Sequence, residues 1–369
     1  MKLAIFSPSN NALTETFIQA HREIPGMEIL FYYNGVEQAK LEGKGSLLDL
    51  SLATRIKKKL VNKLAKYNFT ATQEAVAESF MAEGVECVLA EYGPSGVHIL
   101  PMVEAAGIPL VVHFHGYDAV RHDVIQELGN DYREMFNYAS AVIAVSKVMY
   151  QKLLDLGCPE EKLVLNTYGT HPDFAKVEAT HIHQHLVGLG RFADKKAPYY
   201  TILAFKEVID EYPGAKLTLA GDGPLLDVCK NLVRYYGLEQ FVRFPGPIQR
   251  GDYIEMLKTC RAYVQHSLTP ENGDMEGTPL SILEAQSAGV PVISTNHAGI
   301  PDVVLHEETG LLSEEHDVKA MSEHMRRLLD SRKLAGEMGK KAKARIAENY
   351  SLQRHLDKLA EVIVGTKGE

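Results

Sequence analysis

Residues 272–298 read NGDMEGTPLSILEAQSAGVPVISTNHA, and this stretch decides the fold. Gly277, Thr278 and Pro279 form a turn that opens a helix. Pro279 suits the first helical position because its missing N–H would find no partner there anyway. The apolar run around Val292–Ser294 then predicts a buried strand. A helix followed at once by a buried strand is typical of an α/β protein with a parallel sheet.

The same stretch predicts an anion site. The N–H groups of Thr278, Leu280 and Ser281 would point outward at the positive end of a helix dipole, where phosphate binds well. Glu276 precedes the helix and Glu284 lies about one and a half turns into it. One carboxylate can therefore face a group on each side of a bound diphosphate, as in a nucleotide sugar. The competing interpretation is a surface loop and an amphipathic helix with solvated acids.

Composition limits the classes of protein that fit. A chain of 369 residues is long enough for two domains, and 45% hydrophobic with 24% charged residues is typical of a soluble globular protein. The net charge of −9 argues against nucleic-acid binding by the whole surface. The four cysteines are widely spaced, which favours reduced buried thiols. The start, MKLAIFSPSNN, lacks the apolar core of a secretory signal, and no apolar run reaches about 18 residues, so we expect a cytoplasmic protein without a membrane span.

Short apolar runs alternate with helical patterns along the whole chain, which predicts parallel sheets covered on both faces. We expect an α/β protein of two facing Rossmann-like domains with a cleft between them. The expected domains are residues 1–178, residues 179–345, and a C-terminal helix at 346–369 that packs back on the first domain. The expected strands are Leu3–Ser7, Ile29–Tyr33, Cys87–Glu91, Leu110–Phe114, Ala141–Val145, Leu163–Thr167, Leu186–Leu189, Leu217–Ala220, Val242–Phe244, Tyr263–His266, Val292–Ser294 and Gly310–Leu312.

Three loops leave strand ends in the second domain, where ligands bind in open α/β sheets. In GLGRFADKK (188–196), Arg191 and Lys196 can bring two cations to one diphosphate, with Lys195 as the competing lysine. The glycines of AGDGP (220–224) permit a tight turn and a close approach to a ligand, which makes Gly221 and Gly223 candidates. The FPGP loop around Pro247 can offer backbone groups to a base.

Polar residues also follow strands of the first domain. His115 stands near a strand end and can donate to a sugar hydroxyl or a phosphate, and Asp118 follows three residues later. Thr14 and Glu15, in the loop after the first strand, are candidates for acceptor binding, with helix capping as the alternative for Thr14.

Two further patterns each have two interpretations. The alternation His181-x-His183-x-His185 suits a zinc site or, preferably, a solvated linker between domains. The stretch Arg55–Lys66 (RIKKKLVNKLAK) suits contact with anionic lipid at the inner membrane surface, or a helix with a core-facing apolar stripe and solvated lysines.

Taken together, these segments resemble the retaining glycosyltransferases of family 4, which have the GT-B fold. The run DMEGTP and the TETF loop resemble bacterial exopolysaccharide enzymes within that family. The chain departs from the usual pattern in two places, with Pro8-Ser9-Asn10-Asn11 in place of a Gly-Gly loop and Lys196-Ala197 in place of Lys-Gly. The segments that carry the resemblance are GRFADKK, AGDGP, FPGP, MEGTPLSILEAQSAGVPVIST and AGIPDVV, with HFHGYD, AVSK and TYGTHPDF in the first domain.

The resemblance implies a role for each matched residue. Arg191 and Lys196 would clamp the diphosphate, and the amides at Thr278–Leu280, together with Gly277 and Pro279, would complete its site. Glu284 would bind the ribose hydroxyls and Glu276 the donor sugar near the transferred carbon. His115 would contact the donor sugar from the first domain.

The expected activity is transfer of a sugar from a nucleotide-diphosphate donor to a saccharide or a lipid-linked saccharide, in cell-surface polysaccharide synthesis. No DxD pair ends a strand, so we expect no metal, and no cofactor other than the donor substrate. Two alternatives remain open: a sugar-nucleotide epimerase of similar architecture, and a nucleotide-sugar-binding subunit without turnover.

Overall fold

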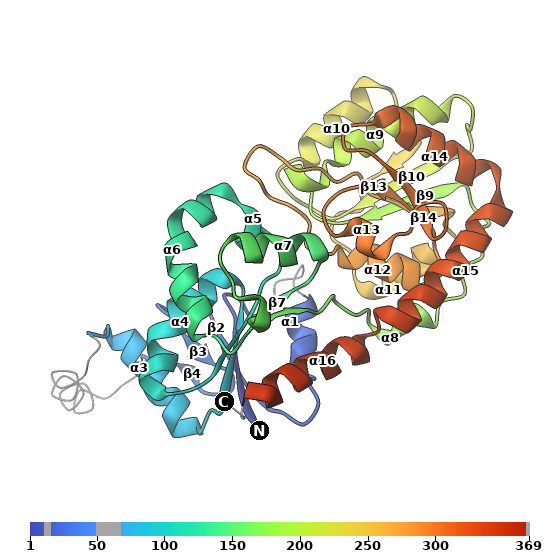
Figure 1. Cartoon of the computed structure of the whole chain (residues 1–369). Coiled ribbons are helices and arrows are strands. Elements are labelled where there is room, and N and C mark those ends of the chain that lie inside the picture. Colours follow the sequence, from blue (N-terminus) through green and yellow to red (C-terminus); the bar gives the residue numbers. More distant parts are fainter. Residues whose placement is uncertain (11–15, 49–67, 367–369) are drawn as a thin grey trace. The chain divides into compact units, whose positions relative to one another are not determined.

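The computed structural model describes residues 1–10, 16–48 and 68–366, and the chain forms two compact units (Figure 1). The first unit contains Met1–Val145, Met149–Asn166 and the chain from Leu356 onward. The second contains Ser146–Val148 and Thr167–His355. Each unit is built on a sheet of its own, so each is described separately.

The first unit is built on an eight-stranded sheet in the order β4-β3-β2-β1-β5-β6-β7-β8. The pairs from β2 to β8 are parallel, whereas β3 and β4 add to one edge in antiparallel orientation. That edge was not predicted, because its strands have only two residues each and leave no periodic pattern. The strands are β1 (Lys2–Phe6), β2 (Glu28–Tyr33), β3 (Lys40–Leu41), β4 (Gly45–Ser46), β5 (Cys87–Glu91), β6 (Leu110–His113), β7 (Ala141–Ala144) and β8 (Leu163–Leu165).

Helices flank this sheet, and their ends follow local signals. The helix α3 begins with a capping box, in which Thr70 accepts from the N–H of Gln73 and Gln73 accepts from the N–H of Thr70. It ends at Gly84, whose φ of 69° suits glycine. The helices are α1 (Thr16–His21), α3 (Ala71–Glu83), α4 (Gly93–Ala106), α5 (Tyr117–Val120), α6 (His122–Tyr138), α7 (Lys147–Asp155), the 3₁₀ turn η1 (Glu160–Lys162) and α16 (Leu352–Gly365).

The second unit is built on a fully parallel sheet in the order β11-β10-β9-β12-β13-β14. The order reverses direction between β9 and β12, which places the carboxyl ends of these strands at a topological switch point. Loops at such a point are where ligands bind in this class of sheet. The strands are β9 (His185–Leu189), β10 (Lys216–Ala220), β11 (Val242–Arg243), β12 (Ala262–Val264), β13 (Val292–Thr295) and β14 (Gly310–Ser313).

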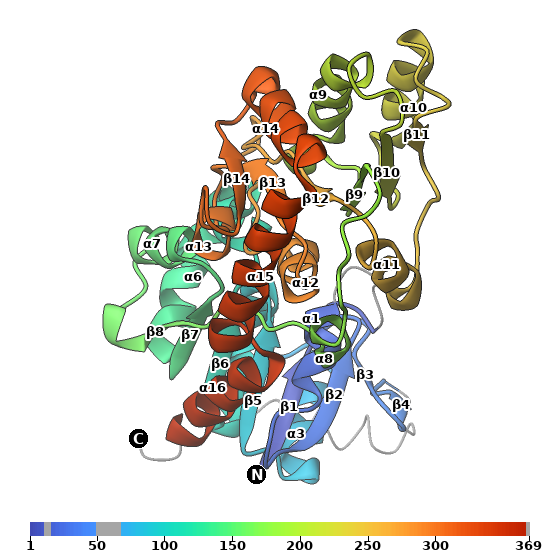
Figure 2. The same cartoon turned by 90° about the vertical axis from the view of Figure 1, so that its right-hand side faces the viewer.

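Helices also cover the second sheet, and α15 packs against α12 (Figure 2). The core of this unit contains Leu186, Leu217 and Val264 of the sheet, Phe205 of α9 and Met325 of α14. The helices are α8 (Pro172–Ala175), the 3₁₀ turn η2 (Asp194–Lys196), α9 (Pro198–Ile209), α10 (Leu226–Tyr235), α11 (Arg250–Leu257), α12 (Leu280–Ser287), α13 (Ile300–Val303), α14 (Val318–Asp330) and α15 (Arg332–Asn349).

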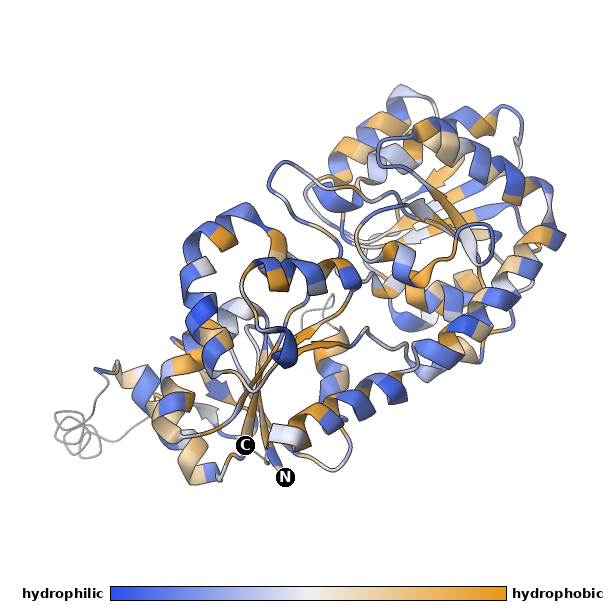
Figure 3. Ribbon diagram, viewed as in Figure 1, coloured by the Kyte–Doolittle hydropathy of each residue, from blue (hydrophilic) through white to orange (hydrophobic). Residues whose placement is uncertain are grey.

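The pattern of hydropathy explains these layers. Figure 3 shows apolar residues concentrated in the strands, whereas the helices alternate apolar and polar residues along their length. All residues of β5, β6 and β7 are buried, as expected for parallel strands covered on both faces. The α/β prediction is confirmed, and every expected strand is present to within two residues at its ends.

The two units divide at a different place from the expected boundaries of 178 and 345. Residues 167–178 group with the second unit, because the N–H of Thr170 donates to the carbonyl of Tyr350 at 3.2 Å and Phe174 packs edge-on against Tyr253. The chain from Leu356 onward groups with the first unit. The side chain of Thr366 there contacts Cys87 of β5. The last helix, α16, thus begins in one unit and ends in the other.

Three smaller predictions can be compared with this structure. All four cysteines are buried and unpaired, as predicted. The three histidines at 181–185 form neither a zinc site nor a solvated linker, because His181 is buried and His185 begins β9 with its Nε2 2.8 Å from Thr218 Oγ1. Within the described ranges, no helix has the length and apolar character that a membrane span needs.

Candidate active site

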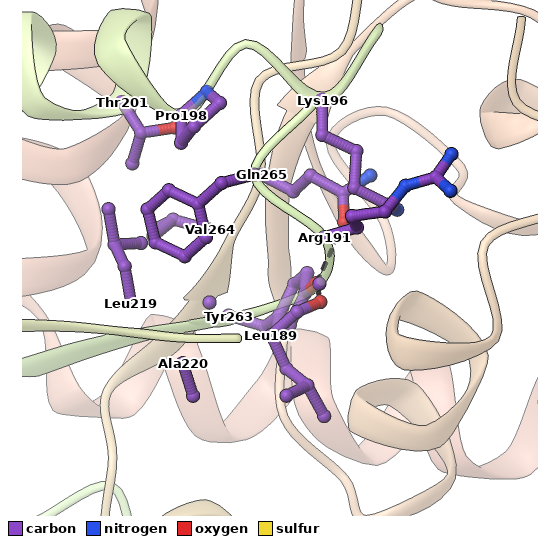
Figure 4. Close-up of a pocket in the computed structure, with 13 residues that line it drawn as sticks. Leu189, Arg191, Lys196, Pro198, Thr201, Leu219, Ala220, Tyr263, Val264 and Gln265 are labelled. Atoms are coloured by element: carbon purple, nitrogen blue, oxygen red, sulfur yellow. Dashed lines mark hydrogen bonds between the residues drawn. The ribbon is translucent and has the colours of Figure 1, made fainter. Parts of the chain in front are cut away.

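A basic loop follows β9 in the second unit. Arg191 is exposed, and its side chain has no hydrogen bond or ion pair with the residues that the structure describes. Lys196 Nζ lies 2.9 Å from Glu276 Oε1 and donates to Gln265 Oε1 at 3.4 Å. Figure 4 shows both basic side chains among the residues that line an open pocket, together with residues from the carboxyl ends of β9, β10 and β12. The loop therefore presents two cations at the switch point of the sheet.

Lys195, the competing candidate, turns elsewhere. Its Nζ lies 3.0 Å from Asp274 Oδ1 and 3.1 Å from the carbonyl oxygen of Met275. Both its side chain and that of Asp274 are largely buried. Lys195 thus holds the loop that leads to Glu276, which favours Lys196 as the lysine available to a diphosphate.

Glu276 is buried at 8% exposure and faces the basic loop. Burial alone would raise the pKa of its carboxyl, but the ammonium groups of Lys196 and Lys195 outweigh burial and hold the pKa below its usual value. The carboxylate is therefore ionised at neutral pH. It can therefore accept hydrogen bonds from hydroxyl groups of a ligand.

The helix α12 begins at Leu280, directly after the Gly277–Pro279 turn. Pro279 is the N-cap rather than the first helical residue, and its carbonyl accepts from the N–H groups of Ile282 and Leu283 at 3.1 and 3.3 Å. The N–H groups of Leu280 and Ser281 have no partner among residues 1–10, 16–48 and 68–366. They are the unpaired donors that every helix leaves at its N-terminus, and such donors favour an anion.

Glu284 lies on α12 and is partly buried. Burial raises the pKa of its carboxyl to about 8, and the attraction of Arg250 offsets only part of that rise. No described residue forms a hydrogen bond or ion pair with this side chain. A carboxyl group in this state is available to a pair of ligand hydroxyls, the task that the family resemblance implies.

Two residues that the sequence did not single out connect the basic loop to α12. The hydroxyl of Tyr263 lies 2.8 Å from Gln265 Oε1, 2.8 Å from Ser281 Oγ and 3.0 Å from the carbonyl oxygen of Leu189. Gln265 also accepts from Lys196. A polar Tyr-x-Gln pair at the end of an otherwise apolar strand was the signal that could have identified them.

The two glycines of the AGDGP loop also have a packing role within the protein. A Cβ on Gly221 would lie 2.0 Å from the carbonyl oxygen of Gly190, and one on Gly223 would lie 2.5 Å from that of Phe192. Both glycines have φ values that disfavour a side chain, 130° and 150°. They therefore permit close packing against the basic loop. Pro247, in the third loop, is exposed.

In the first unit, His115 belongs to a buried hydrogen-bonded group centred on Glu91. Glu91 Oε1 accepts from His21 Nδ1 at 2.6 Å, and Glu91 Oε2 accepts from His115 Nε2 at 2.8 Å. Burial opposes ionisation of Glu91, but the two imidazoles prevail and lower its pKa to about 2. The ring of His115 also packs against Phe17 and Tyr92, with 4.5 Å between ring centroids in each case.

The predicted acceptor residues fare differently. Asp118 is fully buried, and its carboxylate accepts from the N–H groups of Gly93, His115 and Gly116 at 2.8–3.2 Å. It therefore organises its own loop and has no exposed oxygen for an acceptor. Thr14 and Glu15 lie outside the described residues.

One group of described residues could in principle hold a metal ion, namely His21, Glu91 and His113. Their candidate ligand atoms lie within 4.8 Å of one another. The 2.6 Å contact between His21 and Glu91 is a hydrogen bond, shorter than the separation of about 3.3 Å that two ligands take around tetrahedral zinc. The geometry fits a hydrogen-bonded cluster.

Comparisons with known proteins agree with this architecture. The family model for glycosyl transferases group 1 matches residues 175–345, and that for glycosyltransferase family 4 matches residues 49–173. The structure is similar to that of HepE (Alr3699) from Anabaena, solved in complex with UDP and glucose, with a TM-score of 0.77 at 16% identity over 99% of this chain and 100% of that one. The fold is therefore that of a GT-B glycosyltransferase.

The sequence is also similar to curated proteins. It is 28% identical over 287 residues to the putative colanic acid biosynthesis glycosyltransferase WcaL of Escherichia coli K12, which covers 75% of this chain and 69% of the relative. It is 27% identical over 256 residues to the amylovoran biosynthesis glycosyltransferase AmsK of Erwinia amylovora, covering 69% and 63%. With the two family models, these matches show that the chain belongs to the glycosyltransferases of group 1 and family 4.

Proposed function

We propose that this protein transfers a sugar from a nucleotide-diphosphate sugar to an acceptor hydroxyl with retention of anomeric configuration, in the synthesis of an exopolysaccharide. One observation carries the donor assignment: Lys196 contacts Glu276, which lies four residues before the first unpaired amide of α12. Cation, carboxylate and anion-binding helix end thus meet within the second unit. The similarity to WcaL and AmsK supports exopolysaccharide synthesis, and the UDP in HepE supports a nucleotide donor.

In the proposed reaction, the bond between the anomeric carbon and the diphosphate oxygen breaks while the acceptor oxygen bonds to that carbon. The acceptor proton passes to the leaving diphosphate. Arg191, Lys196 and the amides of Leu280 and Ser281 stabilise the charge that develops on this diphosphate. Glu276 orients the donor sugar and Glu284 the ribose. These fixed charges make the proposed reaction independent of metal, so EDTA should leave the rate unchanged.

The acceptor and the location stay predictions. A saccharide or lipid-linked saccharide fits the relatives' names. The stretch Arg55–Lys66, on which contact with the inner membrane surface rests, lies outside the described residues. A cytoplasmic location is likewise an expectation from the sequence alone.

A thermal-shift screen tests the donor first, with UDP, GDP, ADP and their common sugar conjugates. A ligand at 100 times its Kd adds about 2.7 kcal/mol to the free energy of unfolding, which raises the midpoint measurably. A response to one nucleotide family is expected, and it should be lost in Arg191→Ala. The absence of any response to all of them would contradict the proposal.

Incubation with the donor that responds then separates the alternatives. An epimerase changes the donor sugar without an acceptor, whereas a binding subunit leaves the donor intact with or without one. The proposed transferase forms a glycoside only when an acceptor is present. NMR of the product tests retention through the anomeric coupling constant.

A further inference from the structure

The backbone of Glu276 is supported from behind by His297. The N–H of Glu276 donates to His297 Nε2 at 3.2 Å, in a buried contact. Because Nε2 accepts this hydrogen bond, the ring proton sits on Nδ1. His297 Nδ1 lies 2.6 Å from Glu315 Oε1 and donates to it. Glu276, His297 and Glu315 thus form a continuous hydrogen-bonded chain.

Glu315 is itself held in place. Its carboxylate accepts from the N–H of Thr269 at 2.9 Å and from Thr269 Oγ1 at 3.4 Å. These donors, together with His297, outweigh its partial burial and lower the pKa of Glu315. An ionised carboxylate only accepts hydrogen bonds, so Glu315 requires a proton on Nδ1 of His297. In a neutral imidazole, a proton on Nδ1 leaves Nε2 free to accept from the N–H of Glu276.

The segment after His297 also contacts the backbone next to Glu276. A Cβ on Gly299 would lie 1.9 Å from the carbonyl oxygen of Gly277, so residue 299 must be glycine for the two segments to touch. Ala298 between them has a φ of 45°, which L-residues rarely adopt. The loop between β13 and α13 is therefore shaped to support residues 276 and 277.

We propose that His297 is a positioning residue for Glu276, and that Glu315 sets the tautomer that allows this. His297 acts through Glu276, so it governs recognition of the donor sugar and not of the nucleotide. The inference rests on the proposed function, in which the Glu276 carboxylate binds that sugar. If Glu315 were removed, the proton could move to Nε2, where it would oppose the N–H of Glu276.

The test measures Kd by calorimetry for a nucleoside diphosphate and its sugar conjugate, using UDP with UDP-glucose, GDP with GDP-mannose and ADP with ADP-glucose. Because both ligands share the nucleotide, a change in the ratio of the two Kd values between a variant and the unmodified protein reports the contact with the sugar. His297→Leu removes the acceptor and should lower the preference for the sugar conjugate about tenfold, while Kd for the diphosphate changes less than twofold. His297→Gln offers a carbonyl to the same N–H and should keep most of the preference. Glu315→Ala should fall between them.

A matched control lies elsewhere in the same unit. His306 Nδ1 accepts from the N–H of Leu312 at 2.9 Å, and its other ring nitrogen lies 3.6 Å from Glu307. His306→Leu therefore removes the same kind of acceptor, beside a glutamate, away from the Glu276 loop. Its preference for the sugar conjugate should equal that of the unmodified protein.

Glu276→Gln shows how much preference for the sugar conjugate is lost when the Glu276 carboxylate is removed. It also separates the proposed function from the positioning role of His297. If Glu276→Gln loses the preference but His297→Leu keeps it, the positioning role is wrong. If His297→Leu weakens UDP and UDP-glucose equally, His297 only maintains the fold, and the inference also fails. If Glu276→Gln keeps the preference for the sugar conjugate, or if none of the three nucleotide pairs binds, the proposed function fails at its donor assignment and the inference with it.

Discussion

The cluster around Glu91 in the first unit contrasts with two side chains of the candidate site in the second unit, Arg191 and Glu284. In the first unit, the two carboxylate oxygens of Glu91 accept hydrogen bonds from His21 and His115. The carboxylate of Asp118 accepts hydrogen bonds from three backbone N–H groups. In the second unit, Arg191 and Glu284 have no partner within the described chain. The first group, Glu91 and Asp118, has its hydrogen-bond partners within the fold. The second group, Arg191 and Glu284, lacks such partners, and we call it the open group.

This difference separates residues that stabilise the fold from residues that await a ligand. A buried carboxylate with charged partners is costly to disturb, because its removal leaves those partners unpaired. An exposed side chain without partners, such as Arg191, contributes little to the stability of the folded state, so it can be retained for binding. Substitutions in the first group should therefore change stability, and substitutions in the second should change binding and turnover.

The largest effect is expected for Glu91→Ala. Removal of this carboxylate leaves His21 and His115 without their acceptor, which should lower the free energy of unfolding by about 3–5 kcal/mol. Urea denaturation measures it, with the exposed Glu127→Ala as a control that should change stability by less than about 0.5 kcal/mol.

The pH dependence of the same variant sharpens the test. Because the folded pKa of Glu91 is lowered to about 2, its stabilisation is present above the unfolded pKa of 4.5 and is lost as pH falls toward 2. The difference in free energy of unfolding between the unmodified protein and Glu91→Ala should therefore decrease below pH 4.5. A difference in free energy of unfolding that stays constant from pH 7 to pH 3 would show that the Glu91 carboxylate is not ionised.

Arg191→Ala should have the next largest effect, and on a different quantity. Loss of one cation at the diphosphate should lower kcat about 10²- to 10³-fold, while the unfolding midpoint stays unchanged because Arg191 has no partner in the described chain. Arg234→Ala, an exposed arginine on α10, is the control. Turnover in Arg191→Ala close to that of Arg234→Ala would contradict the clamp assignment.

Lys196 makes a useful contrast with Arg191. Its ammonium group is the ion-pair partner of buried Glu276, so Lys196→Ala also leaves the Glu276 carboxylate without that partner. That variant should lose stability together with activity, and Glu276→Gln in the same chain should restore part of the stability. Only Arg191 therefore provides a clean separation of binding from folding.

The sequence predicted the strands well because parallel strands buried on both faces leave a continuous apolar run. It also assigned Lys196 and Glu276 to one ligand, Lys196 through the rule that ligands bind at strand ends and Glu276 through its position before an anion-binding helix. It could not predict that Lys195 turns to Asp274, since adjacent lysines look alike in sequence and only the path of the 274–276 loop separates them.

Contacts between distant segments were the part that sequence could not supply. His297 supports Glu276 across 21 residues of sequence, and Tyr263 reaches Ser281 across 18. The assignment of Asp118 to an acceptor failed for a related reason. A polar residue after a strand looks the same whether it faces solvent or caps its own loop, and here three backbone donors surround it.

Glu284 offers a test of the open group through pH. Its pKa of about 8 in the unbound protein leaves it largely protonated at pH 6.5, whereas ribose hydroxyls bind best to the carboxylate. Affinity for a nucleotide sugar should therefore rise about tenfold from pH 6.5 to pH 8 and then level off. A nucleotide sugar is the right probe, because its diphosphate is esterified at both ends and does not titrate in this range.

Glu284→Gln should abolish that pH dependence. It should also change stability with a predictable sign. A folded pKa raised above 4.5 means that stability falls as pH rises from 4.5 to 8, because only the unfolded chain releases the proton. The glutamine variant should lose that decline. An affinity that is independent of pH in the unmodified protein would remove Glu284 from the ribose site.

The smallest effect concerns backbone strain beside the open site. Ala197 follows Lys196 with a φ of 31° and a ψ of 55°, a left-handed conformation that costs an L-residue about 1–2 kcal/mol. Ala197→Gly relieves this strain, but it also loses a buried methyl group and gains chain entropy in the unfolded state. Its net effect on stability should therefore be close to zero.

Ala288→Gly isolates the strain. Ala288 is equally buried, but its φ of −73° is unstrained. Ala288→Gly therefore also loses a buried methyl group and adds entropy to the unfolded chain, but it relieves no backbone strain. Ala197→Gly should therefore be more stable than Ala288→Gly by about 1–2 kcal/mol in urea denaturation. Equal losses in the two variants would mean that the basic loop holds no strain. The candidate site would then differ from the hydrogen-bonded cluster around Glu91 only in having side chains without partners, and not in backbone strain.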